Sequence, residues 1–208
     1  MSEIDLSELI FKKKTNLTKR PALFLDRDGV LIRDCNYISK PSEVVLEKCS
    51  KNLIRFAHNQ GWILVVVSNQ SGISRKFFTW NDYLKITKKM IFLFEEPNPF
   101  DAIYANSQGP NSKIKNWRKP NPNMILRASQ KLNIDIKNSI IIGDRKTDLL
   151  AGLHSGIKLL IHTNTGHGFK ERQDILKLNR EKTLKDDFKI INIDNLCEFP
   201  TNFLYKIS

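Results

Sequence analysis

Short apolar runs of strand length recur along the chain. They cover residues 22–26, 63–69, 101–105, 139–144, 158–163 and 189–193. Several of these runs are apolar at consecutive positions and do not alternate with polar residues, which is typical of strands covered on both faces. We predict that the six runs form the strands of one sheet.

Stretches with helical spacing of apolar residues lie between these runs. They cover residues 50–60, 79–94, 122–132 and 147–154. Thr79 and Asp82 fit a variant of the capping box at the start of the second stretch. Strands that alternate with helices at this spacing predict βαβ units and a parallel sheet. The prediction is therefore an α/β fold, a three-layer sandwich around a mainly parallel, Rossmann-like sheet.

The start of the chain has a weaker pattern. Residues 1–20 are polar without a clear period, so we expect an N-terminal extension that is at most partly ordered. Residues 21–208 are expected to form a single domain, which ends with a strand and a short helix over 190–204. The longest apolar run, residues 62–67, is far short of the roughly 20 residues of a membrane helix, and the order of charges at the start does not fit a secretory signal. We expect no membrane contact.

Composition and charge narrow the class of partner. The 208 residues are 40% hydrophobic and 27% charged, which suffices for a sizeable core. The net charge of +12 favours an anionic partner, either a nucleic acid or a small phosphorylated substrate. Cys35, Cys49 and Cys197 are odd in number and widely spaced, which argues against a disulfide framework and fits a reducing cytosol.

Polar residues directly follow several of the predicted strands. Asp26, Arg27, Asp28 and Gly29 follow the first run, residues 68–72 (SNQSG) end the second, and residues 143–148 (GDRKTD) follow the fourth. The third run leads into a loop that closes on residues 118–120 (RKP). Ligands of such sheets bind beyond the carboxyl ends of the strands, so we expect these segments to line one cleft.

The residue types in these segments point to phosphoryl transfer. Three carboxylates in one cleft (Asp26, Asp28 and Asp144) repel one another unless a cation lies between them, and an all-oxygen set suits Mg²⁺. Arg118 and Lys119 are suited to bind phosphate, as are Ser68 and the amides of residues 69–72. Such a set favours a carboxylate nucleophile and a second carboxylate as acid and base. Because Asp26 and Asp28 are two residues apart, a turn at Gly29 must reorient Asp28.

At these residues the chain resembles the haloacid dehalogenase (HAD) superfamily. The segments FLDRDGV, VVVSNQSGI, RKP and IIGDRKTDLLAG carry the resemblance, which runs from about residue 21 to residue 168. It is closest to the branch of histidinol-phosphate and D-glycero-D-manno-heptose 1,7-bisphosphate phosphatases. The resemblance implies that Asp26 is the nucleophile and that Asp28 is the acid and base, with a backbone carbonyl that binds Mg²⁺. It also implies that Asp144 completes the metal site.

The same resemblance implies the substrate contacts. Ser68 and Lys119 would hold the transferring phosphoryl group. The full set of implied substrate-binding residues is Asp34, Tyr37, Ser68, Asn69, Gln70, Ser71, Arg118, Lys119 and Arg145, where relatives often have Lys at the last position. The short segment between Asp28 and Ser68 leaves no room for a large cap, so we expect a capless member with an open site.

One departure from the branch concerns zinc. Relatives carry a Cys-x-His and a Cys-x-Cys that bind structural zinc in the loop before RKP. This chain has no Cys or His between His58 and His154. Because tetrahedral zinc needs four such ligands, we expect no zinc site. His167 lies in a glycine-rich segment, and we interpret it mainly as part of a turn.

The function implied is Mg²⁺-dependent removal of the 7-phosphate of a heptose bisphosphate through an aspartyl-phosphate, by a cytoplasmic monomer that makes surface-polysaccharide precursors. Histidinol-phosphate phosphatase is the near alternative. More remote alternatives are a nucleic-acid 3′-phosphatase, a basic nucleic-acid-binding protein and a catalytically silent scaffold. The chain lacks the interleaved aromatic and basic residues of a single-strand platform, so we expect no nucleic-acid partner.

Overall fold

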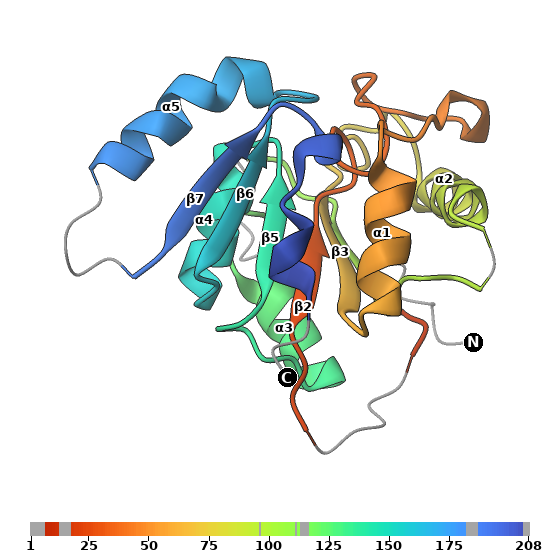
Figure 1. The fold of residues 1–208 in the computed structure, drawn as a ribbon. Helices are drawn as coiled ribbons and strands as arrows, with labels where there is room; N and C mark the ends of the chain where they lie inside the picture. The colour runs from red at the N-terminus through yellow and green to blue at the C-terminus, as the bar shows by residue number, and fades with distance from the viewer. Residues whose placement is uncertain are drawn as a thin grey trace.

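The computed structural model describes residues 7–12, 18–95, 97–110, 112, 117–181 and 187–205. Within these residues, seven strands form one sheet in the order β1-β4-β3-β2-β5-β6-β7, with helices on both sides (Figure 1). The strands β2 to β7 are parallel, and β1 is antiparallel to β4. The predicted α/β fold with a mainly parallel sheet is confirmed.

The six parallel strands match the six predicted apolar runs to within one residue at each end. They are β2 (Ala22–Leu25), β3 (Ile63–Asn69), β4 (Ala102–Asn106), β5 (Ile140–Gly143), β6 (Leu159–Thr163) and β7 (Lys189–Ile193). The antiparallel strand is β1 (Glu8–Ile10). Every residue of β2, β4 and β5 is buried. Their continuous apolar character thus reflects helices on both faces of the sheet.

Four of the five α-helices in the described part of the chain follow the predicted stretches. The helices are α1 (Ser50–Asn59), α2 (Trp80–Leu93), α3 (Asn123–Leu132), α4 (Lys146–Ser155) and α5 (Gly168–Arg180). At the start of α2 the Thr79 hydroxyl accepts a hydrogen bond from the Asp82 amide, as the predicted capping box requires. Gly156 ends α4 with a φ of 99°, a left-handed conformation that favours glycine.

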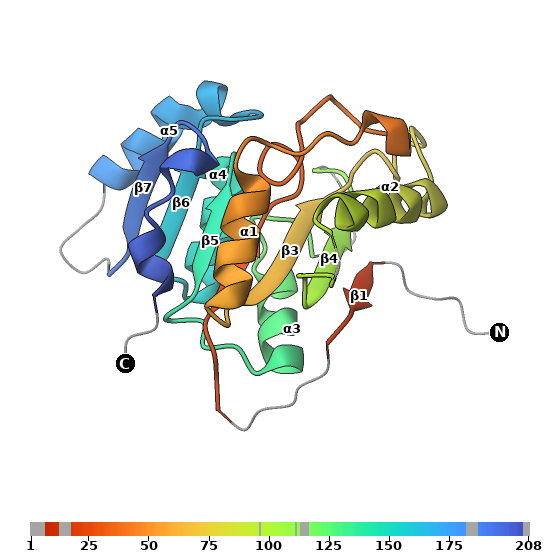
Figure 2. The ribbon, with the colours of Figure 1, turned by 45° about the vertical axis from the view of Figure 1, so that its right-hand side comes forward.

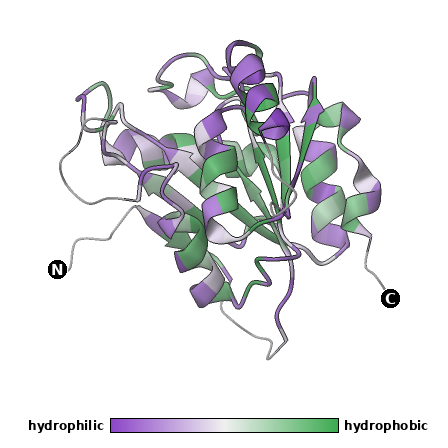
Figure 3. Cartoon of the chain, turned by 90° about the vertical axis from the view of Figure 1, so that its left-hand side faces the viewer, coloured by the Kyte–Doolittle hydropathy of each residue, from purple (hydrophilic) through white to green (hydrophobic). Residues whose placement is uncertain are grey.

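The helices form two layers around the sheet. One apolar cluster joins one face of the sheet to α1, α2 and the short 3₁₀-helices η2 (Leu196–Glu198) and η3 (Thr201–Leu204). A second cluster joins the other face to α3, α4 and α5. Figure 2 shows α1 in front of the sheet and α3 and α4 behind it, and Figure 3 shows hydrophobic strands between helices with hydrophilic outer faces.

One strand and one α-helix were not predicted. Glu8–Ile10 form β1 at one edge of the sheet, beside β4 (Figure 2). This strand lies before the predicted domain boundary at residue 21, which itself remains a prediction. Residues 1–6 and 13–17 of the expected extension lie outside the described residues. The helix α5 was also missed, because it buries only Gly168 and Ile175 and therefore has almost no apolar stripe.

The prediction against a disulfide is wrong in one respect. Cys49, at the N-terminus of α1, is bonded to Cys197 in η2. The two residues are 148 positions apart, and only the fold brings the end of the chain against α1. Cys35 is an exposed free cysteine. The cytoplasmic location stays a prediction.

No described helix combines the length and the apolar character that a crossing of a membrane requires.

Candidate active site

The loops that follow the parallel strands gather at the top of Figure 1 and enclose a cleft of about 360 Å³. This volume is in the range of small-molecule sites. The predicted residues that line it are Asp26, Asp28, Asp34, Tyr37, Asn69, Gln70, Ser71, Arg118, Lys119 and Arg145. The fold therefore brings together predicted residues that are up to 119 positions apart (26 to 145).

Asp26 leaves the end of β2 at the floor of this cleft. Its amide donates a hydrogen bond to the Ile142 carbonyl of β5 at 3.0 Å, and its carboxylate accepts one from the Arg27 amide at 2.7 Å. Gly29 then turns the chain with a φ of 80°. This turn lets Asp26 and Asp28 face the same cleft, as the sequence required.

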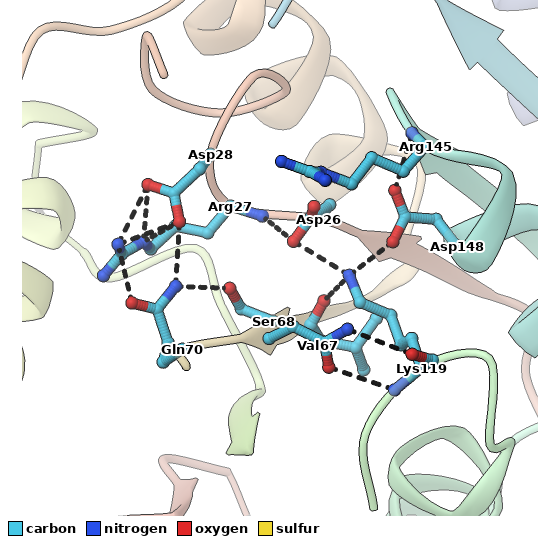
Figure 4. A network of polar contacts seen from close by, with 10 residues as sticks. Asp26, Arg27, Asp28, Val67, Ser68, Gln70, Lys119, Arg145 and Asp148 are labelled. Atoms are coloured by element: carbon cyan, nitrogen blue, oxygen red, sulfur yellow. Dashed lines mark hydrogen bonds and ion pairs between the residues drawn. The ribbon is translucent and has the colours of Figure 1, made fainter. Parts of the chain in front are cut away.

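Lys119 occupies the centre of the site and is only 2% exposed. Its ammonium lies 2.9 Å from Asp26 Oδ1 and 2.7 Å from Asp148 Oδ1, and it donates to the Val67 carbonyl at 2.7 Å (Figure 4). These three partners match the three donors of an ammonium. Asn69 holds the Lys119 backbone from both sides, because its side chain accepts from the amide and donates to the carbonyl.

Asp26, Asp144 and Asp148 form a buried cluster of three carboxylates, called here the carboxylate group. One oxygen of each side chain lies within 4.8 Å of one oxygen of each of the other two. The prediction placed the Asp28 carboxylate in this group. The structure has Asp148 there instead, and the Asp28 carboxylate is bound by Arg27. Asp144 Oδ2 accepts from the His167 amide at 2.7 Å, whereas Asp144 Oδ1 is buried with no hydrogen-bond partner among the described residues. An unpaired buried carboxylate oxygen in an all-oxygen group fits a hard cation such as Mg²⁺.

The packing around this group leaves no room for larger residues. Gly29 and Gly166 have φ angles of 80° and 54°, and both lie against the carboxylate of Asp144. A Cβ atom at either position would lie 2.6 Å or 2.3 Å from Asp144 Oδ2. The two glycines therefore form a close cradle for this carboxylate.

Burial raises the pKa of two of these carboxyl groups. It raises the pKa of Asp26 to about 7, against the lowering effect of the Lys119 charge. Burial also raises the pKa of Asp144 to about 9, with further contributions from the charges of Asp148 and Asp26. Burial lowers the pKa of Lys119, but the charges of Asp148 and Asp26 outweigh it, so that the net shift is upward. The positive charge of Lys119 is therefore not enough to keep both Asp26 and Asp144 ionised at their ordinary pKa values.

In Mg²⁺-free buffer, the free energy of unfolding is expected to fall as the pH rises. A carboxyl group with a higher pKa in the folded protein binds its proton more tightly when folded. The contribution of these two groups to stability is then highest below the ordinary value of 3.8 and declines until the folded values of about 7 for Asp26 and about 9 for Asp144 are passed. Urea denaturation in EDTA at pH values of about 5.5 and 8.5 measures this difference.

The variant Asp144→Asn should reduce that difference, and the exposed Asp174→Asn should leave it unchanged. Added Mg²⁺ should stabilise the wild type more at the higher pH, because the carboxylates are then charged. A pH dependence that is the same in Asp144→Asn and in the wild type would contradict this account.

Asp28 points away from the carboxylate group towards Arg27 and Gln70 (Figure 4). Arg27 donates to both of its oxygens at 2.9–3.2 Å, and Gln70 donates to Oδ2 at 2.8 Å. Gln70 also donates to the Ser68 hydroxyl at 2.7 Å. Ser68 is buried beneath Gln70, so its predicted contact with a phosphoryl group stays a prediction.

Three arginines gather on another part of the cleft wall. Arg75, Arg118 and Arg145 all line the cleft. Burial lowers the pKa of Arg118, and the charges of Arg145 and Arg75 lower it further. Arg75 donates to the Tyr37 hydroxyl at 2.8 Å. Guanidinium groups that repel one another beside a cleft are suited to bind an anion with more than one charge.

His167 lies in the predicted turn, directly before α5, and it also lines the cleft. Its Nε2 is 3.0 Å from Asp34 Oδ2, so the loop after β2 is tied to the start of α5. Glu171, one turn further along α5, accepts a hydrogen bond from the Lys146 amide at 2.6 Å. The carboxylates of Asp34 and Glu171 in the cleft wall therefore already have partners within the protein, His167 and the Lys146 amide.

Three residues of the site were not predicted from the sequence, namely Asp148, Arg75 and Arg27. The signal for Asp148 was available, because it lies four residues after Asp144 in the first turn of a helix that follows a strand. Arg75 lies in the same loop as Ser71 but outside the segment that was assigned. No local pattern distinguishes Arg27 from a surface arginine.

A buried Lys–carboxylate centre and an all-oxygen carboxylate group above a parallel sheet define a phosphate-processing α/β enzyme. The family model described as HAD-hydrolase-like matches residues 116–187. A Helicobacter pylori (strain ATCC 700392 / 26695) protein named D-glycero-beta-D-manno-heptose-1,7-bisphosphate 7-phosphatase is 36% identical, over 75% of this chain and 97% of its own. A Campylobacter jejuni protein named for the alpha form of the same substrate is 33% identical, over 80% of this chain and 99% of its own.

A solved structure supports the same grouping. The D,D-heptose 1,7-bisphosphate phosphatase of B. bronchiseptica, in complex with magnesium and phosphate, superposes with a TM-score of 0.71 at 25% identity. The match covers 82% of this chain and 92% of that one. The chain belongs to the HAD superfamily, and within it the chain is a phosphatase that hydrolyses phosphomonoesters.

Proposed function

We propose that this protein removes the 7-phosphate of a D-glycero-D-manno-heptose 1,7-bisphosphate. The observation that carries the proposal is that one cleft holds two groups for phosphate, the centre around Lys119 and the cluster of Arg75, Arg118 and Arg145. A substrate with two phosphates matches such a cleft better than one with a single phosphate. The names of the relatives support the same substrate class.

In the proposed mechanism Asp26 is the nucleophile. Its carboxylate forms a bond to phosphorus while the bond from phosphorus to the sugar oxygen breaks, and Asp28 gives a proton to that oxygen. Asp28 then takes a proton from the water that attacks the aspartyl-phosphate, and inorganic phosphate is released. Lys119 holds Asp26 and neutralises the charge on the phosphoryl oxygens.

Asp26, Asp144 and Asp148 would hold Mg²⁺, with the Asp28 carbonyl that the family resemblance implies. When bound, the ion supplies positive charge that offsets the carboxylates and the phosphoryl group. The absence of zinc remains a prediction from the sequence. Residues 111 and 113–116 of the loop in question lie outside the described residues.

Histidinol-phosphate phosphatase is the second candidate, because carboxylates that suit an amine or imidazole line the cleft. They are Asp34 and Glu171. Each is already engaged, Asp34 with His167 and Glu171 with the Lys146 amide. The arginine cluster therefore favours the bisphosphate.

A panel of phosphate esters tests the proposed function. Phosphate release with Mg²⁺ is measured for both anomers of the heptose bisphosphate, histidinol phosphate, hexose bisphosphates and a 3′-phosphorylated oligonucleotide. We expect the highest kcat/KM for one heptose anomer. Faster release from histidinol phosphate or from the oligonucleotide would contradict the proposal and assign that compound as the substrate class.

Replacing Arg118 with Gln is expected to raise KM for the heptose bisphosphate by about 10- to 100-fold, since charged hydrogen bonds contribute about 1.5–3 kcal/mol. KM for heptose 7-phosphate, which lacks the second phosphate, should change much less. The exposed Arg55→Gln on α1 is the matched control. Equal increases for both substrates would show that Arg118 does not bind the second phosphate.

A further inference from the structure

Arg27 lies in the middle of the site, yet the proposed mechanism gives it no step. It stands between Asp26 and Asp28 and is 1% exposed. Its Nε and Nη2 atoms donate to both oxygens of the Asp28 carboxylate at 2.9–3.2 Å. A planar guanidinium on a carboxylate fixes the orientation of that carboxylate as well as its charge.

Gln70 completes the contact from the loop after β3. Its Nε2 donates to Asp28 Oδ2 at 2.8 Å and to Ser68 Oγ at 2.7 Å, and its Oε1 accepts from Arg27 Nη2 at 3.1 Å (Figure 4). Gln70 is 4% exposed. Both ends of its amide are therefore used within the protein, which favours a positioning role over direct substrate contact.

The far side of Arg27 is covered by α2. The guanidinium carbon lies 5.3 Å from the centre of the Tyr83 ring, and Nη1 is buried without a hydrogen-bond partner among the described residues. Burying a guanidinium with an unpaired nitrogen costs free energy. A buried ion pair is also weak support for stability in itself. The cost therefore points to a role for Arg27 in function.

We propose that Arg27 is a positioning residue for Asp28, and that Gln70 acts with it. The proposal rests on the proposed function, in which Asp28 protonates the departing sugar oxygen. As the bond from phosphorus to oxygen breaks, the proton moves from Asp28 to that oxygen and leaves a carboxylate. Arg27 stabilises this carboxylate and keeps it aimed at the cleft. The same carboxylate then accepts the proton of the attacking water.

Leaving groups of different acidity distinguish a positioning role of Arg27 for Asp28 from a merely structural role. A sugar alcohol is a poor leaving group and needs the proton, whereas p-nitrophenolate departs without it. The test compares kcat/KM for p-nitrophenyl phosphate with kcat/KM for the sugar or alkyl phosphate that the wild type hydrolyses fastest. This ratio reports the step in which the leaving group departs, because kcat/KM covers steps up to the first irreversible one.

We expect Arg27→Met to lower kcat/KM for the sugar or alkyl phosphate by about 100-fold, and that for p-nitrophenyl phosphate by less than about ten-fold. Arg27→Lys should recover part of the loss, since it keeps the charge but not the planar fork. Asp28→Asn should show the same selectivity. The exposed Arg33→Met is the matched control. If Arg27→Met does not fold, Gln70→Met replaces it, with a smaller loss of the same selectivity.

Two results would overturn the proposal, and they are distinguishable. Equal losses for both substrates in Arg27→Met, with a selective loss in Asp28→Asn, would leave the proposed mechanism intact and make Arg27 merely structural. Equal losses for both substrates in Asp28→Asn would show that Asp28 is not the acid, so that the mechanism fails together with the inference.

Discussion

Replacing Asp26 with Asn is expected to lower kcat for the heptose bisphosphate by about 10⁴-fold or more, as losses of a covalent nucleophile do. The amide cannot form the aspartyl-phosphate. It also removes one of the two carboxylates that hold Lys119 at 2.9 Å and 2.7 Å. The loss should therefore be the same for every ester that the wild type hydrolyses, whatever its leaving group.

Phosphate release and acid-quench mass spectrometry check this prediction together. The wild type should carry a phosphoryl group on Asp26 during turnover, and Asp26→Asn should carry none. Asp174→Asn makes the same chemical change at an exposed position of α5 and should keep full activity. A phosphorylated residue other than Asp26, or an active Asp26→Asn protein, would assign the nucleophile elsewhere.

The second large effect concerns Lys119. Replacing it with Met is expected to lower the free energy of unfolding by about 3–5 kcal/mol in Mg²⁺-free buffer at a pH of about 8.5, because it leaves two buried carboxylates, Asp26 and Asp148, without their cation. The ammonium is 2% exposed, so solvent does not screen this interaction. Lower pH should reduce the loss, because burial raises the pKa of Asp26 to about 7 and its protonation removes one charge.

Urea denaturation with and without Mg²⁺ measures this effect. The double variant Asp26→Asn/Lys119→Met should lose less stability than the sum of its single changes, since one of the unpaired carboxylates is gone. Lys131→Met, exposed on α3, is the control. A loss below about 1 kcal/mol for Lys119→Met would mean that the centre is open to water and that the ion pairs are weak.

The six parallel strands and four of the α-helices were predictable because their signals are local. Consecutive apolar residues in 63–67 or 140–142 identify strands buried on both faces, and Gly61 and Gly156 end helices through their own backbone preferences. The helix α5 and the strand β1 gave no such signal. They are held by contacts with distant parts of the chain, β1 by β4 and α5 by Ile175 in the core.

The same distinction applies to the site. Asp26, Lys119 and Asp144 were predictable because each follows a strand in a recognisable segment. The replacement of Asp28 by Asp148 in the carboxylate group was not, because it depends on Arg27 binding Asp28 and on Lys119 approaching Asp148 from a loop that follows another strand. The Cys49–Cys197 bond likewise joins segments that only the complete sheet brings together.

The most direct measurement follows the two phosphates of the heptose bisphosphate by ³¹P NMR during turnover with Mg²⁺. The proposed function predicts that the 7-phosphate signal of one anomer is replaced by inorganic phosphate, while the 1-phosphate signal persists to the end of the reaction. Asp26→Asn should leave both signals unchanged. Loss of the 1-phosphate, or an unchanged spectrum with active wild-type enzyme, would contradict the assignment of this protein as a heptose bisphosphate 7-phosphatase.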